Sequence, residues 1–245
     1  MRAVRRLALV VPAALLAIVG VLVVEVLLAR RGPMLEEGRL DLDGRVGPPT
    51  GSAVRVVWLG DSTAAGVGVT DVADALPRQV AERLGRPIDL TVLAVSGDTV
   101  GDVLGDQVPA VGALDPDVVY VSIGANDVTH LTTRDDFDER YRRVLDALPD
   151  GVSVVLLGVP DMGAVPRLAQ PLRAIAGFRG RELDEVVRAI AADRGAAYVP
   201  IAAATGPTFR ADPDRMFAAD SYHPSAAGYR LWADAVHAAA PDPLG

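Results

Sequence analysis

Short apolar stretches alternate with longer amphipathic ones along most of the chain. The short stretches are rich in Val, Leu and Ile and are bounded by turn residues, which is typical of buried strands. They predict strands at Val54–Leu59, Asp89–Ala94, Val118–Ile123, Val152–Val159 and Ala197–Ile201. The amphipathic stretches predict helices at Val72–Leu84, Val100–Val111, Arg134–Leu148 and from Pro224 to about Ala240. Further helical pieces are predicted between Pro166 and Arg194, with breaks at Gly177 and Gly180. We expect loops at Asp161–Pro171 and Ala202–Ala219.

This alternation predicts the fold class. A strand, a helix and a second strand in succession form a parallel βαβ unit, because the helix returns the chain to the same edge of the sheet. We therefore expect an α/β protein, a three-layer α/β/α sandwich with a central parallel sheet of about five strands. In such sheets the ligand binds beyond the carboxyl ends of the strands.

The first 31 residues follow another pattern. From Leu7 to Ala29 the sequence is apolar apart from Pro12, Gly20 and Glu25, and this length matches the roughly 20 residues that a helix needs to cross a bilayer. We predict that residues 7–29 anchor the protein in the cell membrane as a single pass, with the N-terminus in the cytoplasm and the domain that follows outside it. The alternative is a cleaved signal peptide and a secreted protein, although the run is long for one and lacks a small-x-small cleavage site.

The composition of the remaining residues divides them into two parts and excludes several kinds of chemistry. Residues 32–52 are rich in Gly and Pro and predict a flexible linker, which leaves residues 53–245 as the folded domain. The formal charge of -8 argues against a nucleic-acid partner. With no Lys and no Cys in the chain, Schiff-base and thiolate chemistry are excluded, and the three scattered His residues give little support to a metal site.

Polar clusters follow three of the predicted strands directly. They are Gly60–Thr63, Ser96–Asp98 and Gly124–Asp127, and a fourth cluster, Asp220–Pro224, precedes the last helix. Because the carboxyl ends of parallel strands meet at one edge of a sheet, we expect these clusters to form one site. They contain a hydroxyl nucleophile, an imidazole base, an orienting carboxylate and amide donors, which is the residue set for acyl transfer.

In these four blocks the chain resembles the SGNH (GDSL-type) hydrolase superfamily, over most of residues 53–240. The resemblance implies that Ser62 is the nucleophile and that Asp220 and His223 complete the triad. It further implies an oxyanion hole formed by Ser62, Gly97 and Asn126 and a reaction that needs no cofactor. The Gly-x-Ser-x-Gly elbow of the α/β-hydrolases is absent from the sequence.

Each site residue also has a purely structural interpretation. Ser62 could cap a helix, and Gly97 could serve a turn that needs positive φ. Asp61 and Asp127 are expected to brace turns rather than to transfer protons. His130, in a second Asp-x-x-His sequence, competes with His223 for the role of base, and the family pattern favours His223. His237 is expected to lie on the surface or to serve packing.

The sequence alone does not choose between three functions. The first is a serine esterase that hydrolyses lipid-like or carbohydrate-bound acyl or acetyl esters. The second is an acyltransferase with the same triad, and the third is a non-catalytic, membrane-tethered binding domain. The sequence predicts neither the acyl length nor the alcohol half of the substrate, because the pocket walls are expected to come from loops such as Asp161–Pro171 and Ala202–Ala219. It gives no oligomeric state.

Overall fold

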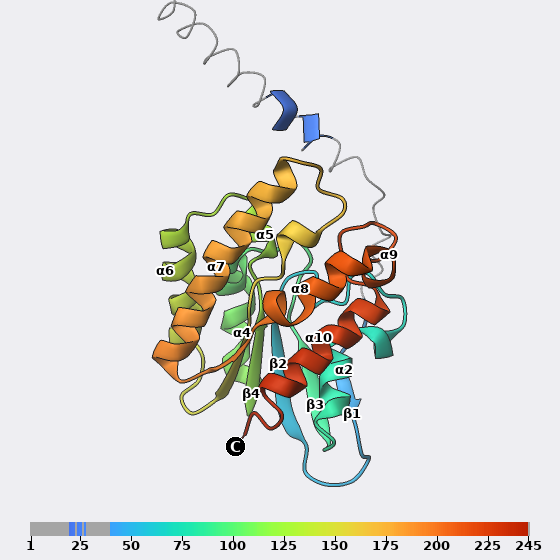
Figure 1. Cartoon of the computed structure of the whole chain (residues 1–245). Helices are drawn as coiled ribbons and strands as arrows, with labels where there is room; N and C mark the ends of the chain where they lie inside the picture. The colour runs from blue at the N-terminus through green and yellow to red at the C-terminus, as the bar shows by residue number, and fades with distance from the viewer. Residues whose placement is uncertain (1–19, 23, 26, 28–39, 245) are drawn as a thin grey trace, which may run out of the picture.

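The structure, a computed structural model, describes residues 20–22, 24, 25, 27 and 40–244 and has a six-stranded sheet at its centre (Figure 1). The strands are β1 (Gly44–Val46), β2 (Val54–Gly60), β3 (Ile88–Val92), β4 (Val118–Ser122), β5 (Ser153–Leu157) and β6 (Ala197–Val199). They lie in the order β1-β3-β2-β4-β5-β6, and every pair is parallel except β1 with β3. The predicted α/β class is confirmed, but the sheet has six strands instead of about five and is mostly parallel, because β1 pairs with β3 in the antiparallel direction.

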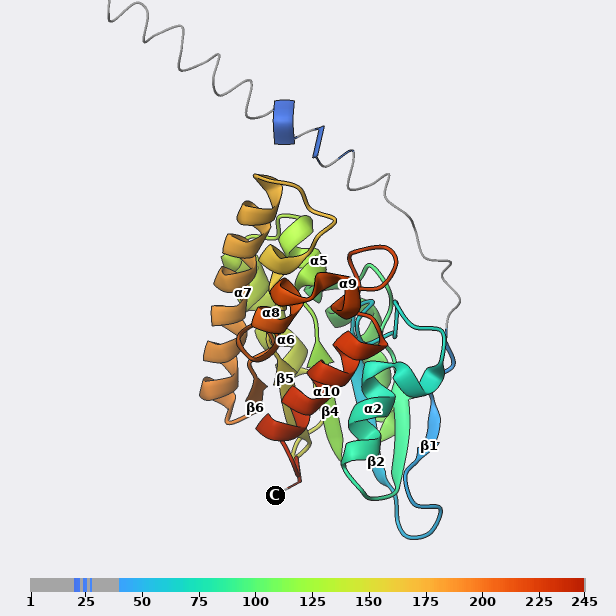
Figure 2. The same cartoon turned by 45° about the vertical axis from the view of Figure 1, so that its right-hand side comes forward.

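Helices cover both faces of this sheet (Figure 2). They are α2 (Leu76–Arg83), α3 (Val100–Asp102), α4 (Val108–Leu114), α5 (Ala125–Thr129), α6 (Arg134–Asp146), α7 (Leu172–Arg194), α8 (Ile201–Ala211), α9 (Pro213–Met216) and α10 (Ala226–Ala239). A π-helical turn, η2 (Val103–Gln107), joins α3 to α4, and the 3₁₀ turns η1 (Val72–Asp74) and η3 (Met162–Ala164) precede α2 and α7. Helix α10 packs against α2 and α8 on one face, while α6 packs against α7 on the other.

The site is positioned by strand β2, which lies between β3 and β4. The chain leaves β2 toward β3 on one side and then crosses to β4 on the other, so β2 marks a topological switch point. Its core partner is β4, where Trp58 lies directly opposite Tyr120 and the two rings stack at 4.6 Å. Both side chains are fully buried, so this pair fixes the register of the two strands that carry the site.

Part of the predicted linker forms the additional strand β1. Residues 32–39 lie outside the described residues, but Gly44–Val46 pairs with β3 in antiparallel register, and Leu42 and Val46 are buried. The prediction of five strands missed β1 because a three-residue strand among glycines and prolines has no detectable period. It forms because β3 would otherwise leave an unpaired edge.

Two helical predictions also need correction. The expected loop Ala202–Ala219 contains α8 and α9, and Ile201 begins α8 instead of ending a strand. The expected breaks at Gly177 and Gly180 do not occur, because α7 runs without interruption from Leu172 to Arg194. A Cβ at Gly177 would meet the Cα of Gly163 at 2.9 Å, so this glycine provides space for η3 to pack on the helix.

The predicted membrane segment falls largely outside the described residues. Of residues 7–29 the structure describes only 20–22, 24, 25 and 27, and Glu25 accepts a hydrogen bond from the backbone N–H of Leu172 at 2.9 Å. Within the part of the chain that is described, no helix has both the length and the apolar character needed to span a bilayer.

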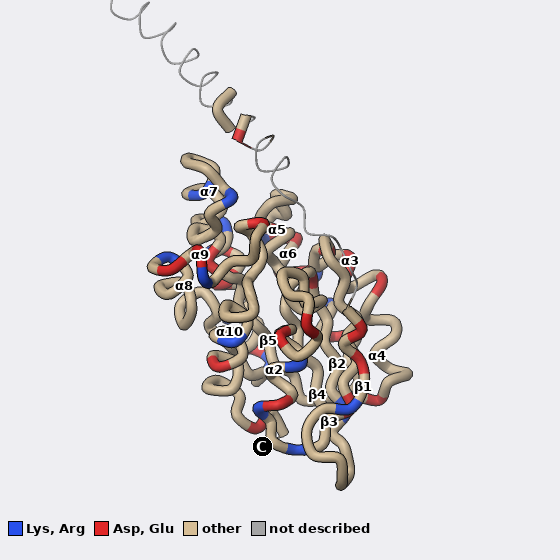
Figure 3. Tube along the Cα trace, turned by 90° about the vertical axis from the view of Figure 1, so that its right-hand side faces the viewer, with Lys and Arg blue, Asp and Glu red and all other residues tan. Residues whose placement is uncertain are grey.

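Arginine and acidic positions are interspersed along the trace of the described chain (Figure 3). Several form ion pairs between neighbouring elements, as where Arg83 of α2 meets Asp234 of α10 at 2.7 Å. Such exposed pairs contribute at most about 1 kcal/mol each to the free energy of unfolding. The fold is therefore held mainly by the aliphatic core on the two faces of the sheet.

Candidate active site

Ser62 lies in the turn that follows β2. The strand ends at Gly60, whose φ is +153° and where a Cβ would collide with the carbonyl oxygen of Ser122 on β4. Only glycine lets the chain leave the sheet so close to its neighbour. The backbone N–H of Asp61 then donates to the same Ser122 carbonyl at 3.2 Å. The turn is thereby fixed at the carboxyl end of the sheet, and Ser62 is 6% exposed.

His223 approaches Ser62 from the segment before α10. Its Nε2 lies 3.0 Å from Ser62 Oγ, and its Nδ1 lies 2.6 Å from Asp220 Oδ2. The other oxygen of Asp220 accepts hydrogen bonds from the backbone N–H groups of Tyr222 and His223, each at 3.0 Å. The carboxylate is therefore locked by its own loop and can orient the imidazole toward the serine.

The environment of Asp220 favours its charged form. Burial alone would raise the pKa of this carboxyl, but the hydrogen bonds from the His223 ring and from two backbone N–H groups outweigh it and hold the pKa below its usual value. Asp220 thus remains ionised beside His223 at neutral pH. A carboxylate in this position stabilises an imidazolium when the ring takes up a proton.

Asn126 and Gly97 follow β4 and β3, the two strands that flank β2. Asn126, in the first turn of α5, donates through Nδ2 to the carbonyl oxygen of Asp98 at 2.9 Å, which leaves its second amide proton unused by this bond. Gly97 has a φ of +93°, and a Cβ there would meet open space. The expected turn at Gly97 is present, and its backbone is accessible from solvent.

Asp127 braces this part of the structure, as expected. Its carboxylate accepts from the backbone N–H of Val100 at 3.1 Å and from the Thr132 hydroxyl at 3.0 Å, and it is fully buried. Asp127 therefore connects helix α5 to the start of α3. The Asp127 carboxylate makes no hydrogen bond with Ser62 or His223.

Asp61 braces the nucleophile turn in a similar way. Its Oδ1 accepts from the backbone N–H of Thr63 at 2.9 Å and from the Thr63 hydroxyl at 2.8 Å. Burial raises the pKa of Asp61 to about 6, although both hydrogen bonds from Thr63 act in the opposite direction. Asp61 is 1% exposed, so desolvation of its charged form is the dominant effect.

This shift predicts a pH-dependent cost in stability. The pKa of Asp61 is 3.8 in the unfolded chain and about 6 in the folded one, so the folded state binds the proton more tightly. The stabilisation that the protonated side chain gives the folded state is therefore lost as the pH rises through 6. We expect Asp61→Asn to remove this dependence and to gain about 3 kcal/mol relative to wild type between pH 4 and pH 7. Urea unfolding at four pH values measures this difference in the free energy of unfolding. Asp234→Asn, on the surface, serves as control, and parallel curves for wild type and Asp61→Asn would refute the assignment.

The two other histidines lie apart from this arrangement. His130 is exposed, and its Nδ1 donates to the backbone carbonyl of Asn126 at 2.8 Å. His237 is exposed on α10. Of the two Asp-x-x-His sequences, only the one that contains His223 places its ring on Ser62.

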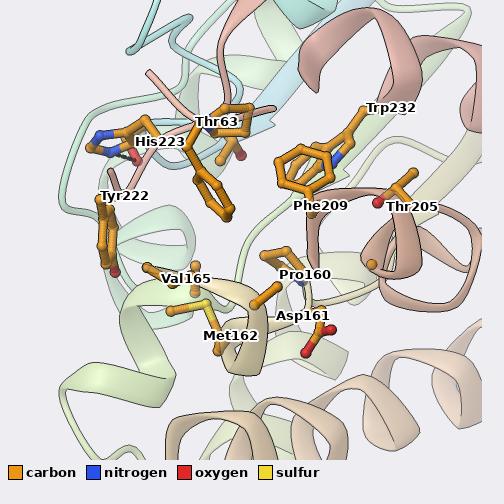
Figure 4. Close-up of a pocket in the computed structure, with 16 residues that line it drawn as sticks. Thr63, Pro160, Asp161, Met162, Val165, Thr205, Phe209, Tyr222, His223 and Trp232 are labelled. Carbon is orange, nitrogen blue, oxygen red and sulfur yellow. Dashed lines mark hydrogen bonds between the residues drawn. The ribbon is translucent and has the colours of Figure 1, made fainter. Parts of the chain in front are cut away.

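An apolar pocket with a volume of about 40 Å³ opens beside Ser62 and His223 (Figure 4). Tyr222 and Val165 line one side of the pocket, and Phe209 and Trp232 line the other. The segment Ala202–Ala219, expected to line the pocket as a loop, does so through Phe209 on helix α8, a residue that the sequence prediction did not single out. The i, i+4, i+8 spacing of Ile201, Thr205 and Phe209 could have indicated the helix.

No group of three or more His, Asp or Glu side chains among the described residues is arranged to hold a metal ion. The polar groups around Ser62 instead form hydrogen bonds to one another and to the backbone. Their arrangement suits proton transfer at a hydroxyl oxygen next to an apolar cavity.

Most of the described chain matches a known protein family. Residues 58–231 match the sequence model of the GDSL-like Lipase/Acylhydrolase family. The chain belongs to this family. The match begins on β2 and ends in α10, so it includes Ser62, His223 and all the loops that meet at the site.

Enzymes are among the proteins that this chain resembles in sequence or structure. The chain is 37% identical over 198 residues to the GDSL-like esterase Rv1075c of Mycobacterium tuberculosis, over 78% of this chain and 63% of that relative. It therefore spans less than two thirds of the relative's length. The lipase/acylhydrolase from Enterococcus faecalis superimposes with a TM-score of 0.61 at 25% identity, over 75% of this chain and 93% of the other. Phospholipase A1 from Streptomyces albidoflavus shares the fold, with a TM-score of 0.57 at 24% identity over 77% of this chain and 100% of the other.

Proposed function

We propose that the protein is a serine hydrolase of carboxylic esters, in which Ser62 is the nucleophile, His223 the base and Asp220 the orienting carboxylate. The observation that carries this proposal is the line of hydrogen bonds from Ser62 Oγ to His223 Nε2 at 3.0 Å and from His223 Nδ1 to Asp220 Oδ2 at 2.6 Å. A serine hydroxyl is a weak nucleophile unless a neighbouring base accepts its proton during attack.

In the first half of the reaction, Ser62 Oγ attacks the ester carbonyl carbon while His223 Nε2 takes the hydroxyl proton. The carbonyl electron pair moves onto the oxygen, and the tetrahedral intermediate then collapses with cleavage of the bond to the alcohol. His223 returns its proton to the departing alkoxide, which leaves an acyl group on Ser62.

In the second half, His223 Nε2 removes a proton from water as the water oxygen attacks the acyl carbon. Collapse of the new intermediate breaks the bond to Ser62 Oγ, which regains the proton from His223, and the carboxylic acid leaves. An alcohol in place of water would make the protein an acyltransferase. Product analysis with a competing alcohol distinguishes the two outcomes.

The backbone N–H groups of Ser62 and Gly97 and the side-chain amide of Asn126 would stabilise the oxyanion. Two features support this role: Gly97 is exposed at its turn, and Asn126 is held by the Asp98 carbonyl with one amide proton still available. Donors fixed before the reaction begins stabilise developing charge without the cost of reorganising solvent.

The pocket beside Ser62 suits a short acyl group. Its volume of about 40 Å³ has room for roughly three water-sized groups. Phe209 closes one side of the pocket and packs edge-on against Phe217, with ring centroids 5.0 Å apart. We infer that p-nitrophenyl acetate and butyrate are better substrates than octanoate.

Replacing Phe209 with alanine tests the acyl pocket. Without the ring, longer chains gain apolar contact surface, and we expect the octanoate-to-acetate ratio of kcat/KM to rise about 10-fold or more. Phe178→Ala is the matched control, because Phe178 is an exposed phenylalanine on α7 that does not line the pocket. An unchanged ratio in Phe209→Ala would show that the acyl chain binds elsewhere.

We also propose that residues 7–29 anchor the enzyme in the membrane, with the hydrolase domain outside the cytoplasm. The length and apolar character of this segment support the proposal. The full chain, expressed in a bacterial host, is then expected to stay in the membrane pellet after a carbonate wash. A soluble protein whose mass lacks about 30 residues would indicate signal cleavage and secretion instead.

A further inference from the structure

Gln107 is a buried polar residue for which the reaction described above has no role. It is 3% exposed and is the last residue of the π-helical turn η2. Its Oε1 accepts from the backbone N–H of Gly60 at 2.9 Å, and its Nε2 donates to the Gly60 carbonyl at 2.8 Å. The same Nε2 donates to Asp98 Oδ2 at 2.7 Å. One side chain thus makes three hydrogen bonds to two loops of the site.

The two partners of Gln107 belong to the loops that carry the proposed oxyanion donors. Gly60 ends β2 and precedes Ser62 by two residues, and Asp98 directly follows Gly97. The backbone carbonyl of Asp98 also accepts from Asn126 Nδ2 at 2.9 Å. Each of the three donors is therefore linked to a residue that Gln107 bonds: Ser62 to Gly60 along the chain, Gly97 to Asp98 along the chain, and Asn126 to Asp98 by a hydrogen bond.

We propose that Gln107 is the positioning residue of the oxyanion hole, which rests on the proposed function of Ser62, Gly97 and Asn126. By bonding both backbone groups of Gly60 and the side chain of Asp98, it sets the separation between the nucleophile turn and the Gly97 turn. A misplacement of about 1 Å in catalytic groups can cost roughly 100-fold in rate, so the position of each oxyanion donor matters.

Glutamine is suited to this position because it must accept and donate at once. Glutamate would keep the bond from the Gly60 N–H but could donate neither to the Gly60 carbonyl nor to Asp98, and leucine would lose all three bonds. The π-helical turn is the backbone feature that brings the residue there, since its wider i→i+5 spacing interrupts the α-helical register between α3 and α4.

The first test compares Gln107→Leu and Gln107→Glu with wild type in the full chain, with p-nitrophenyl acetate as substrate. We expect kcat to fall about 10- to 100-fold in both variants while KM stays within about twofold, because only transition-state stabilisation is lost. Gln79→Leu is the matched control. Gln79 is also buried and donates to a backbone carbonyl, that of Asp74, but it lies on α2 outside the site. Equal kcat in wild type and a folded Gln107 variant would overturn the proposal.

A second pair of variants avoids substitution in the core. The Asp98 side chain lies at the half-buried rim and accepts from Gln107. Asp98→Ala removes this acceptor, whereas Asp98→Asn keeps an oxygen that can accept the same bond. We expect kcat to fall in Asp98→Ala and to be largely restored in Asp98→Asn. Equal activity of the two variants would refute the positioning role even if both Gln107 variants fail to fold.

A double substitution separates this proposal from the assignment of the reaction itself. Asn126→Ala alone is expected to lower kcat about 100- to 1,000-fold. If Gln107 acts through the oxyanion hole, Gln107→Leu should cost much less in the Asn126→Ala background than in wild type. Full additivity would overturn the role of Gln107, whereas unchanged turnover in Ser62→Ala would instead overturn the proposed function.

Discussion

Replacing His223 with alanine is expected to lower kcat for p-nitrophenyl esters by about 10⁴- to 10⁶-fold. The ring lies 3.0 Å from Ser62 Oγ, and no other imidazole is bonded to this hydroxyl among the described residues. Without it, the proton of Ser62 has no acceptor during attack and the leaving alkoxide has no donor. Ser62→Ala should cause a loss of similar size, and the double variant should lose little more, because the two side chains act as a unit.

His130→Ala is the control for this prediction. His130 stands in the second Asp-x-x-His sequence, but it is exposed and bonds the backbone carbonyl of Asn126. We expect its removal to change kcat by no more than about twofold, as for most surface substitutions. The triad assignment would be wrong if His130→Ala abolished turnover while His223→Ala retained it.

Asp220→Asn is expected to lower kcat by about 10⁴-fold with little change in KM. An asparagine oxygen can still accept from the backbone N–H groups of Tyr222 and His223, so the loop should keep its shape. The amide N–H₂ would then face His223 Nδ1, where a donor meets a donor, and the ring would turn or adopt the tautomer that cannot accept the serine proton.

Asp234→Asn serves as the matched control for Asp220→Asn. Asp234 is a carboxylate on α10 that pairs with Arg83 near the surface, far along the helix from the triad. Its substitution should leave kcat unchanged. A variant Asp220→Asn that kept more than about a tenth of wild-type kcat would show that this carboxylate does not control the ring.

The features that the sequence predicted correctly are local ones. The Val-rich strands and the polar residues directly after them depend on periodicity and on turn chemistry within about ten residues. Parallel strands then bring these clusters to one edge without further information. The choice of His223 over His130 depended on the resemblance to a family, since both have the same spacing to an aspartate.

The features that were missed depend on contacts between distant parts of the chain. Strand β1 forms because β3 offers an unpaired edge, and three residues carry no period that could reveal it. Helix α8 contains Pro207, a residue that is unusual inside a helix, and its buried face packs on α10. Gln107 belongs to no motif, because its partners include backbone groups 47 residues away, which only the fold brings near.

The most direct test of the account is to treat the folded full-length protein with a fluorophosphonate and to map the adduct by mass spectrometry. Attack by Ser62 Oγ on phosphorus, with departure of fluoride, should attach one phosphonyl group to Ser62. The adduct should be absent in Ser62→Ala and form far more slowly in His223→Ala, because the hydroxyl is activated only by the ring. An unlabelled folded wild type, or a label on another residue, would contradict the assignment of Ser62 as an activated nucleophile.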